Sequence, residues 1–299
     1  MKNENLQDYI LVADAGSTKC EWCLICPNDT EHLVHTHGIN PITQNDECIR
    51  AILMDELYPS LATILPHEQV KIDIYYYGAG CIPSVCERMS QLLTATIPHV
   101  SKASVHSDLL GAARALCGHH AGIACILGTG ANSCLYDGKD IVQHTSPLGY
   151  ILGDEGSGAY IGKRLVGDVL KGLLPTELCE DFLERYSLSE SIIINKVYRE
   201  PGANSFLASL TPFLAEHRSH PEIHQLLVSC FTEFFHRNID NYKQPLLPVN
   251  FVGSIALHFQ PELEEAAHGC GYRLGRILQR PITLMAQYHI DEQGTTGDK

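Results

Sequence analysis

The chain reads Tyr9-Ile-Leu-Val-Ala-Asp-Ala-Gly-Ser-Thr-Lys-Cys-Glu-Trp-Cys-Leu-Ile-Cys26 near its start, with two apolar runs on either side of small and polar residues. This pattern predicts two buried strands, Tyr9–Ala13 and Cys20–Cys26, joined by a turn over Asp14–Thr18. A third strand at Leu33–Thr36 would complete a meander. Small residues in such a turn leave backbone N–H groups open, so several of them can point at one phosphate oxygen.

The residues of this turn suit a phosphate. Asp14 could hold Mg²⁺ through water, and Gly16 lets the backbone come close, while Ser17, Thr18 and Lys19 supply donors and positive charge. The alternative is an ordinary tight hairpin. Short glycine-containing matches are common by chance, so one turn of this kind favours the hairpin.

A second strand–turn–strand unit makes a phosphate-binding turn more favoured relative to an ordinary hairpin. Strand Ile123–Leu127, the turn Gly128-Thr-Gly-Ala-Asn-Ser133 and strand Cys134–Tyr136 repeat the opening pattern about one small domain later. We interpret the pair as an internal duplication that gives two domains. Two turns from duplicated domains could clamp a triphosphate between them.

The rest of the chain fits an α/β fold. A helix at Glu47–Leu61, a strand at Val70–Tyr77 and a helix from Pro83 give the first half the order βββαβα. The second half is expected to be mostly helical over 156–242. After it we expect a strand at Val249–Ile255 that runs into Gly253-Ser254, a helix at Pro261–Leu278 and a frayed polar tail at Asp291–Lys299.

Asp108 follows Ser107 directly before the apolar-periodic run Leu109–Leu116, as at a helix start. It could act as the general base that takes a proton from a hydroxyl attacking phosphorus. The alternative role is a helix N-cap, and the two roles are compatible.

Two carboxylates lie in the segment Gly153-Asp-Glu-Gly-Ser-Gly158, ahead of a predicted helix. They could bind hydroxyl groups of a substrate or help to hold Mg²⁺ through water, or they could simply complement the helix dipole. Gly158–Arg164 is a near match to a P-loop, but its spacing is one residue short and Arg164 replaces the hydroxyl residue, so we reject that motif.

Composition narrows the function classes. The net charge of −14 over 299 residues makes nucleic acid an improbable partner, and the sequence shows no signal peptide and no apolar run long enough for a bilayer. Twelve scattered cysteines predict reduced thiols and, with the start of the chain, the cytoplasm. Cys20, Cys23 and Cys26 have the spacing of an iron–sulfur motif, but alternation along a strand would point Cys23 away from the other two, so no cluster is expected.

Several motifs, in this order and spacing, resemble the N-acetylglucosamine kinases and related ATPases of the actin, heat-shock ATPase and sugar kinase superfamily, which include activators of the benzoyl-CoA reductase type. The segments that carry the resemblance are Asp14–Lys19, Gly38-Ile-Asn-Pro41, His106-Ser-Asp108, Gly128–Asn132, Gly149-Tyr-Ile-Leu-Gly-Asp-Glu-Gly-Ser157 and Phe251-Val-Gly-Ser254. The resemblance implies two duplicated actin-like, ribonuclease H-like domains with an ATP and sugar cleft between them. The expected domains are 1–117 and 118–281, and residues 282–299 can return to the first.

The resemblance also implies roles for single residues. Asp108 matches the catalytic base, Asp14 the residue that meets Mg²⁺, and ATP is the co-substrate. The matching nucleotide contacts are Asp14, Gly16, Ser17, Thr18, Lys19, Gly128, Thr129, Gly130, Gly253 and Ser254. The matching acceptor contacts are Asn40, Asp108, Ala131, Asn132, Leu148, Gly149, Asp154 and Glu155.

The expected function is therefore Mg-ATP-dependent phosphorylation of a hydroxyl, the 6-OH, of an amino sugar such as N-acetylglucosamine or glucosamine, by a cytoplasmic homodimer without a nucleic-acid or membrane partner. Leu148 stands where animal N-acetylglucosamine kinases carry a Trp, so the acetamido preference is open. One alternative is an ATP-driven iron–sulfur activator of a CoA-ester dehydratase or reductase. Another is a sugar-sensing protein without catalysis.

Overall fold

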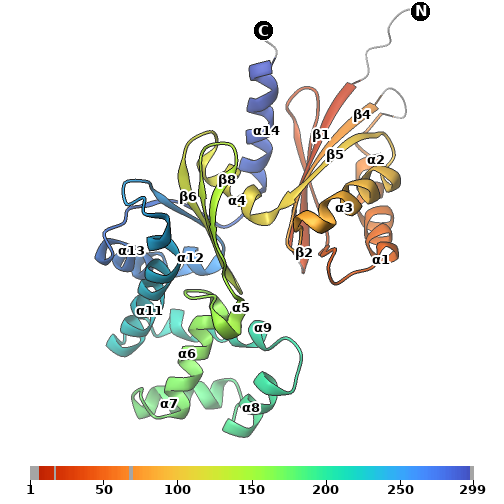
Figure 1. Cartoon of the computed structure of the whole chain (residues 1–299). Helices are drawn as coiled ribbons and strands as arrows, with labels where there is room; N and C mark the ends of the chain where they lie inside the picture. Colours follow the sequence, from red (N-terminus) through yellow and green to blue (C-terminus); the bar gives the residue numbers. More distant parts are fainter. Residues whose placement is uncertain (1–6, 17, 67–69, 297–299) are drawn as a thin grey trace, which may run out of the picture. The chain divides into compact units, whose positions relative to one another are not determined.

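The computed structural model describes residues 7–16, 18–66 and 70–296, and this part of the chain divides into two compact units (Figure 1). One unit takes in the described residues up to His119 together with those from Arg280 onward, and the other runs from His120 to Gln279. Each unit is built on one mixed sheet of five strands. No described helix is long and apolar enough to cross a lipid bilayer.

The sheet of the first unit has the strand order β3-β2-β1-β4-β5. The first three strands form the predicted antiparallel meander, while β4 and β5 run parallel to β1. The sequence analysis missed β5, because it is a largely polar edge strand with few buried positions. The strands are β1 (Gln7–Ala15), β2 (Lys19–Ile25), β3 (Glu31–His37), β4 (Val70–Gly78) and β5 (Val100–Ser107).

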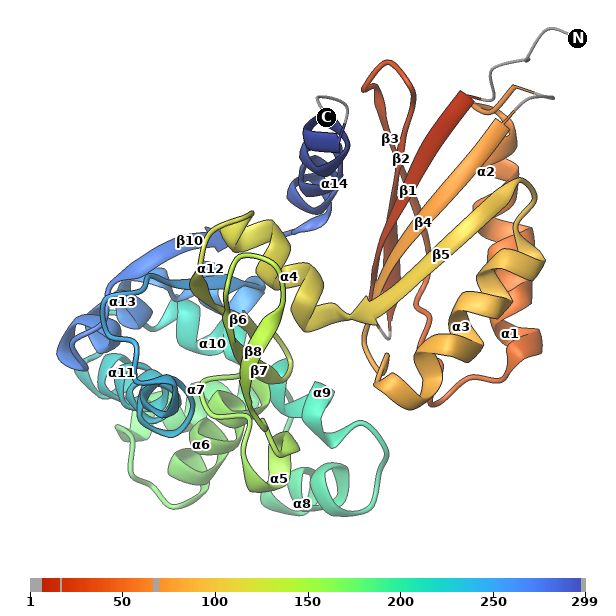
Figure 2. The same cartoon turned by 45° about the horizontal axis from the view of Figure 1, so that its top comes forward.

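Helices cover both faces of this sheet (Figure 2). The predicted helix at Glu47–Leu61 is interrupted by a π-helical turn. The predicted fraying of the tail is wrong for Asp291–Thr296, which is helical. One face packs against α1 (Asp46–Ala51), η1 (Ile52–Leu57), α2 (Tyr58–Ala62) and α3 (Pro83–Thr96), and the other against α4 (Asp108–Cys117) and α14 (Ile282–Thr296).

Alternation along the strands decides which side chains meet which helices. Ala13 and Ala15 of β1 belong to the core with α1–α3, so the intervening Asp14 faces the α4 and α14 side. Cys20 and Cys26 both contact the α1–α3 core and Cys23 does not, as the sequence predicted. The candidate carboxylate thus lies on the face that α4 and α14 cover.

The second unit repeats the topology of the first, with the strand order β10-β9-β6-β7-β8. An antiparallel meander is again followed by two strands that run parallel to its first member, which supports the duplication. The expected strand Val249–Ile255 ends at Val252, because α12 begins at Ser254. The strands are β6 (Gly122–Leu127), β7 (Ala131–Tyr136), β8 (Ile141–Thr145), β9 (Val249–Val252) and β10 (Leu274–Leu278).

The second unit carries most of the helices, as expected for 156–242. The expected helix Pro261–Leu278 is wrong in its second half. It ends at Gly269, Gly271 takes a left-handed φ of 80°, and the apolar residues that follow form β10. The helical segments are α5 (Gly149–Leu152), α6 (Gly158–Leu170), α7 (Thr176–Arg185), α8 (Glu190–Tyr198), α9 (Ala203–Ala208), α10 (Thr211–Glu216), α11 (Pro221–Phe234), η2 (Phe235–Ile239), η3 (Asp240–Tyr242), α12 (Ser254–His258) and α13 (Gln260–Gly269).

Candidate functional site

The turn between β1 and β2 is held by backbone hydrogen bonds. The Gly16 N–H donates to the Lys19 carbonyl at 3.0 Å, and the Ile39 N–H donates to the Gly16 carbonyl at 3.2 Å. The Thr18 carbonyl accepts from the Gly38 N–H at 3.0 Å. Ser17 lies outside the described residues. The turn is therefore tied to the segment that leads into Asn40.

Three carboxylates gather beside this turn in the first unit. Asp14 lies opposite Glu21 in the β1–β2 register. The pKa of Asp14 is raised to about 7, mainly by burial and then by the charges of Glu21 and Asp108, while Lys19 acts in the opposite direction. A buried carboxyl with two acidic neighbours favours either a proton or a cation.

Glu21 is a site residue that the sequence analysis missed. Its side chain is buried, and it pairs with Lys19 Nζ at 2.9 Å and with Arg280 Nη1 at 3.5 Å. The sequence feature that could have identified Glu21 was a charged residue inside an otherwise apolar strand. Glu21 links the lysine of the turn to the residue at which the chain re-enters the first unit.

Asp108 begins α4, but the N-cap is Ser107, whose Oγ accepts from the Leu110 N–H at 3.3 Å. One carboxylate oxygen of Asp108 accepts from the Leu109 N–H at 2.8 Å. No other described residue donates a hydrogen bond to this carboxylate, apart from the N–H of Asp108 itself. Burial raises the pKa of Asp108. Because Ser107 caps the helix, Asp108 keeps one oxygen for another partner.

Asn40, which follows β3, lies at the same edge of the sheet, where its side chain packs against the turn after β4. Gly80 has a left-handed φ of 78°, and a Cβ there would lie 2.6 Å from the Asn40 Oδ1 atom. The next residue, Cys81, lies close enough to Asp108 for the carboxylate to raise its pKa, although burial is the larger cause. Asp14, Asn40 and Asp108 thus lie around the carboxyl ends of β1 and β4 and the start of α4.

The turn between β6 and β7 has free backbone donors. The carbonyls of Gly128 and Thr129 accept from the N–H groups of Gly158 and Ala159, at 2.8 and 3.0 Å, where α6 begins. The Gly128 N–H donates to the Gly130 carbonyl at 3.0 Å. The N–H groups of Thr129 and Gly130 have no partner among the described residues. Such exposed amides can bind an anion.

Asp154 lies directly against this turn. Its backbone is left-handed, with a φ of 53°, and its Oδ1 accepts from the Ala131 N–H at 3.3 Å. Burial raises the pKa of Asp154. The neighbouring Asn132 uses its Oδ1 atom to meet His144 Nε2 at 2.9 Å. The structure therefore brings Ala131, Asn132 and Asp154 together.

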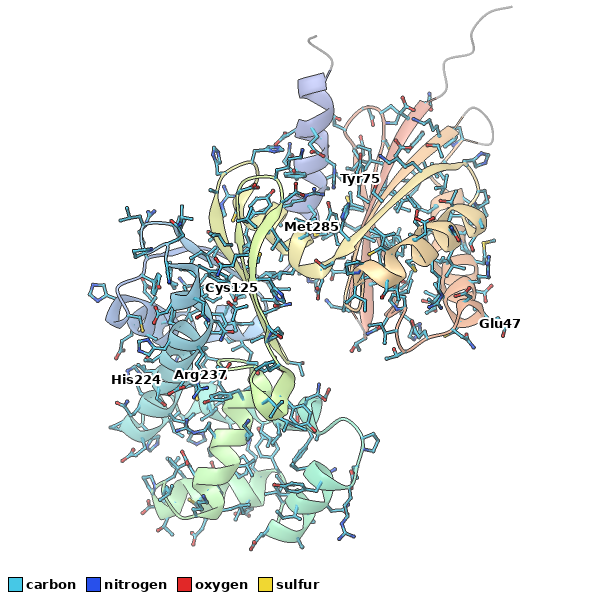
Figure 3. All side chains as sticks on the ribbon, viewed as in Figure 1. Glu47, Tyr75, Cys125, His224, Arg237 and Met285 are labelled. Carbon is cyan, nitrogen blue, oxygen red and sulfur yellow. The ribbon has the colours of Figure 1, made fainter. Side chains whose placement is uncertain are left out.

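Other predicted acceptor residues lie in different settings. The Glu155 carboxylate accepts from Asn238 Nδ2 at 3.4 Å and lies 3.8 Å from Nε of Arg237, which Figure 3 labels. These contacts direct it toward η2. Leu148 and Gly149 have left-handed φ values of 61° and 73° where α5 begins, and Leu148 is 61% exposed.

Gly253 makes a close backbone contact that no other residue could make. Its φ is 125°, and a Cβ there would lie 2.2 Å from the Leu127 carbonyl oxygen. Its N–H donates to the Leu278 carbonyl at 2.9 Å. The contact holds the start of α12 against the end of β6, so that Ser254 and Thr129 line one cavity.

Two adjoining cavities open beside these glycine turns of the second unit. The smaller, of about 260 Å³, has walls of backbone and hydroxyl groups; the larger, of about 400 Å³, is more apolar. Ser205, Ser209 and Thr211 were missed, because no motif marks them in the helical stretch. The smaller cavity is lined by Gly128, Thr129, Ser205, Ala208, Ser209, Thr211, Ser254 and Ile255, and the larger shares five of these residues and adds Pro212, Ala215, Glu216, His258 and Phe259.

Comparison with solved structures places this geometry among known proteins. A Porphyromonas gingivalis protein, provisionally described as an N-acetylglucosamine kinase, is 43% identical over 95% of this chain and 99% of that one, with a TM-score of 0.88. A Chromobacterium violaceum protein with the same provisional description is 19% identical, over 94% and 98% of the two chains, with a TM-score of 0.74.

A ROK hexokinase from Thermus thermophilus is 11% identical over 95% of this chain and 99% of that one, with a TM-score of 0.52. The two more distant likenesses concern the fold alone. No protein-family model and no curated protein matches the chain. The predicted fold class, two duplicated actin-like units with mixed sheets, is confirmed.

Proposed function

Because this chain belongs to the N-acetylglucosamine kinase-like family of the actin-like ATPase superfamily, we propose that it transfers the γ-phosphoryl group of ATP to an amino sugar. The acceptor is N-acetylglucosamine or glucosamine, at its 6-hydroxyl. The observation that carries the proposal is the Asp108 carboxylate, which is fixed through one oxygen at a helix start beside Asp14 and has its other oxygen uncommitted.

Asp108 is the general base in this proposal. Its carboxylate takes the proton of the sugar hydroxyl as the hydroxyl oxygen attacks the γ-phosphorus, and ADP leaves. A pKa raised by burial suits this work, because a base is most effective when its pKa approaches the operating pH. The ionised form is the active one, so activity should rise with pH through the pKa of Asp108.

The nucleotide is bound by the second unit in this proposal. The free N–H groups of Thr129 and Gly130 and the Ser254 hydroxyl suit phosphate oxygens, and the hydroxyl groups of Ser205, Ser209 and Thr211 also line the small cavity beside them. The adjoining apolar cavity, with Phe259 and Ile255 in its walls, suits a nucleoside. The turn with Gly16, Thr18 and Lys19 supplies further phosphate contacts.

The carboxylates of the first unit fit a magnesium ion that arrives with ATP. Burial is the main cause of the raised pKa of Asp14, and the nearby Glu21 and Asp108 add negative charge that a cation would neutralise. Among the described residues no three His, Cys, Asp or Glu side chains are grouped to hold a metal by themselves. Mg²⁺ usually keeps several waters and phosphate oxygens, so Asp14 would hold it through water, and the bound ion would neutralise phosphate charge.

Each unit offers candidate acceptor contacts of its own. Asn40 and Asp108 offer polar groups in the first unit, and Ala131, Asn132 and Asp154 offer them in the second. Leu148 and Gly149 begin the segment that contains Asp154, and we propose that the exposed Leu148 side chain contributes to acceptor selectivity. Glu155 acts through the packing of this segment against η2.

The test is ADP release from Mg-ATP with a panel of hexoses and amino sugars, followed by identification of the phosphorylated product. Asp108→Asn should lower kcat at least about a hundredfold, because general-base catalysis contributes about that much or more. ATP binding should be nearly unchanged. The matched control is Asp55→Asn, which alters an exposed aspartate in the first turn of another helix of the same unit.

The two variants separate the outcomes. Near-normal turnover in Asp108→Asn would exclude it as the base. No ADP release by the wild type with any sugar of the panel would contradict the kinase proposal. A brown protein with cluster absorbance after anaerobic purification would support the iron–sulfur activator instead.

A further inference from the structure

A chain of buried polar side chains connects three elements of the first unit. Arg114 of α4 donates from Nη1 to the Tyr77 hydroxyl of β4 at 2.6 Å. The same hydroxyl lies 2.8 Å from Nε2 of His289, which belongs to α14 and is 1% exposed. Residues 212 positions apart in the sequence thus share one hydrogen bond.

Only one assignment of donors and acceptors is consistent with the hydrogen bonds among Arg114, Tyr77 and His289. A guanidinium can only donate, so the Tyr77 oxygen accepts from Arg114 and gives its own hydrogen to His289 Nε2. A neutral imidazole fits this role, and burial lowers the pKa of His289 to about 3, with Arg114 adding to the effect. The hydrogen of His289 is then on Nδ1, which lies 3.2 Å from Oε2 of Glu292 but makes no hydrogen bond with the described residues.

Close packing holds the same three elements together. The Tyr75 ring stacks on His289 with 3.6 Å between ring centroids. A Cβ at Gly111 of α4 would lie 2.8 Å from Tyr77 Cβ and 2.9 Å from the Met285 methyl group. Figure 3 labels Tyr75 on the sheet and Met285 on α14. Hence α4 has little freedom to shift against β4 or α14.

The chain of hydrogen bonds lies next to the proposed catalytic groups. Tyr77 is the register partner of Asp14 across β1 and β4, and of His106 across β4 and β5. Arg114 lies on the helix that Asp108 begins. The network therefore sits on the same sheet face as Asp14 and grips the helix that carries Asp108.

An apolar contact could join these elements at lower desolvation cost. Buried polar groups lose their hydration, and replacing them by apolar residues is often neutral or stabilising. What a buried hydrogen-bonded network adds is a single geometry, and here the Tyr77 hydroxyl both accepts from Arg114 and donates to His289. We propose that Tyr77, Arg114 and His289 are positioning residues that hold α4, and with it the Asp108 carboxylate, in the orientation needed for phosphoryl transfer. This proposal rests on the proposed function.

Tyr77→Phe is the direct test, because it removes one hydroxyl and leaves both Arg114 and His289 without that partner. We expect kcat for the sugar to fall at least about tenfold, since small displacements of a reacting group are costly. The KM for ATP should stay within about twofold. The matched control is Tyr272→Phe, which removes a hydroxyl that donates to Asp240 at 2.7 Å in the second unit. It should leave kcat unchanged.

His289 gives a second test that does not depend on Tyr77→Phe folding. His289→Gln keeps an acceptor for the Tyr77 hydroxyl and should retain most of kcat, whereas His289→Leu should lose about as much as Tyr77→Phe. Equal kcat in the Gln and Leu variants, or a lower melting temperature of Tyr77→Phe with normal kcat, would overturn the proposal and leave a purely structural role.

Amide hydrogen exchange separates this proposal from the proposed function. In Tyr77→Phe the amides of Leu109 and Leu110, in the first turn of α4, should exchange faster than in the wild type, while those of α6 stay unchanged. If the wild type releases no ADP with any sugar, the kinase proposal fails. The role of the network in holding α4 is then tested by hydrogen exchange alone. Unchanged protection of the first turn of α4 would contradict it.

Discussion

Asp14 should make the stability of the ligand-free protein depend on pH. Its pKa in the folded state is about 7, raised from 3.8 mainly by burial and then by Glu21 and Asp108. A carboxyl with a raised folded-state pKa binds its proton more tightly when folded than when unfolded. The stabilisation is therefore complete below about pH 4 and is lost as the pH rises through about 7.

We predict that the unfolding free energy of the ligand-free protein falls between about pH 4 and pH 7 more steeply in the wild type than in Asp14→Asn. A shift of about three pKa units corresponds to at most about 4 kcal/mol, and less if water reaches the site. Urea unfolding at a series of pH values measures the difference. Asp55→Asn is the control and should follow the wild type. Parallel curves for the wild type and Asp14→Asn would mean that Asp14 is already ionised.

Many of the candidate site residues could be predicted from the sequence, and others could not. Asp14, Asp108 and the Gly128–Asn132 turn follow from short local patterns, in which turn residues lie next to strands. Glu21 was missed because its importance depends on the partners it meets, Asp14 across β1 and Arg280 from the far end of the chain. Such pairs arise from register, which one strand does not specify.

At the scale of elements, α6 supports the proposed phosphate turn. Its first N–H groups, from Gly158 and Ala159, bind the carbonyls of Gly128 and Thr129. Farther along the helix, Gly162 packs so closely on α9 that a Cβ would lie 2.0 Å from the Leu207 carbonyl oxygen. A Cβ at Gly167 would meet nothing within 4 Å. Gly162 and Gly167, which belong to the same helix, thus differ in packing: the first is in close contact and the second is open.

Gly162→Ala should destabilise the protein by about 1–3 kcal/mol or more, because a backbone clash must push α6 away from α9. The same displacement should raise the KM for ATP by shifting the carbonyl partners of the phosphate turn. Gly167→Ala should instead stabilise the protein by about 0.5–1 kcal/mol, because alanine favours a helix over glycine. Urea unfolding and steady-state kinetics of both variants test this. Equal effects of the two substitutions would show that α6 and α9 are loosely packed.

The helices and strands of the site were predicted unevenly. Strongly apolar strands such as β1 and β6 were found, because both of their faces are buried and the run is nearly continuous. The polar edge strands β5 and β8 were missed, and β10 was predicted as helix. Edge strands gain their structure from hydrogen bonds to a neighbour rather than from burial of their own side chains.

At the scale of the whole molecule, each unit has its own core, and α14 packs on the face of the first unit's sheet opposite the α1–α3 core. Met285, Ala286, Tyr288 and His289 of α14 are buried, and they cover the sheet face that carries Asp14. The chain leaves the first unit directly after α4 and re-enters it directly before α14. The two helices that join at the Tyr77 network are thus the ones next to both connections between units.

Truncation after Gln279 should therefore unfold the first unit selectively. Hydrogen exchange of the truncated protein should show lost protection in β1, β4 and α4, while α6 and α11 of the second unit keep theirs. The second unit serves as the internal control, because it consists of one continuous segment. Retained protection in β1 and α4 would mean that the first core is stable without α14.

The expected homodimer and cytoplasmic location stay predictions. Sedimentation of the intact protein tests the expected homodimer.

The sequence by itself determined the duplicated strand–turn–strand units, the glycine turns suited to phosphate and the position of Asp108 at a helix start, because each depends on residues close together in the chain. Only the tertiary structure decided that Ser107 takes over the capping of α4, that Gly253 touches the end of β6 and that His289 reaches Tyr77. Those contacts join residues far apart in the chain, and a hydrogen bond or close packing between distant segments leaves no periodic trace in either one.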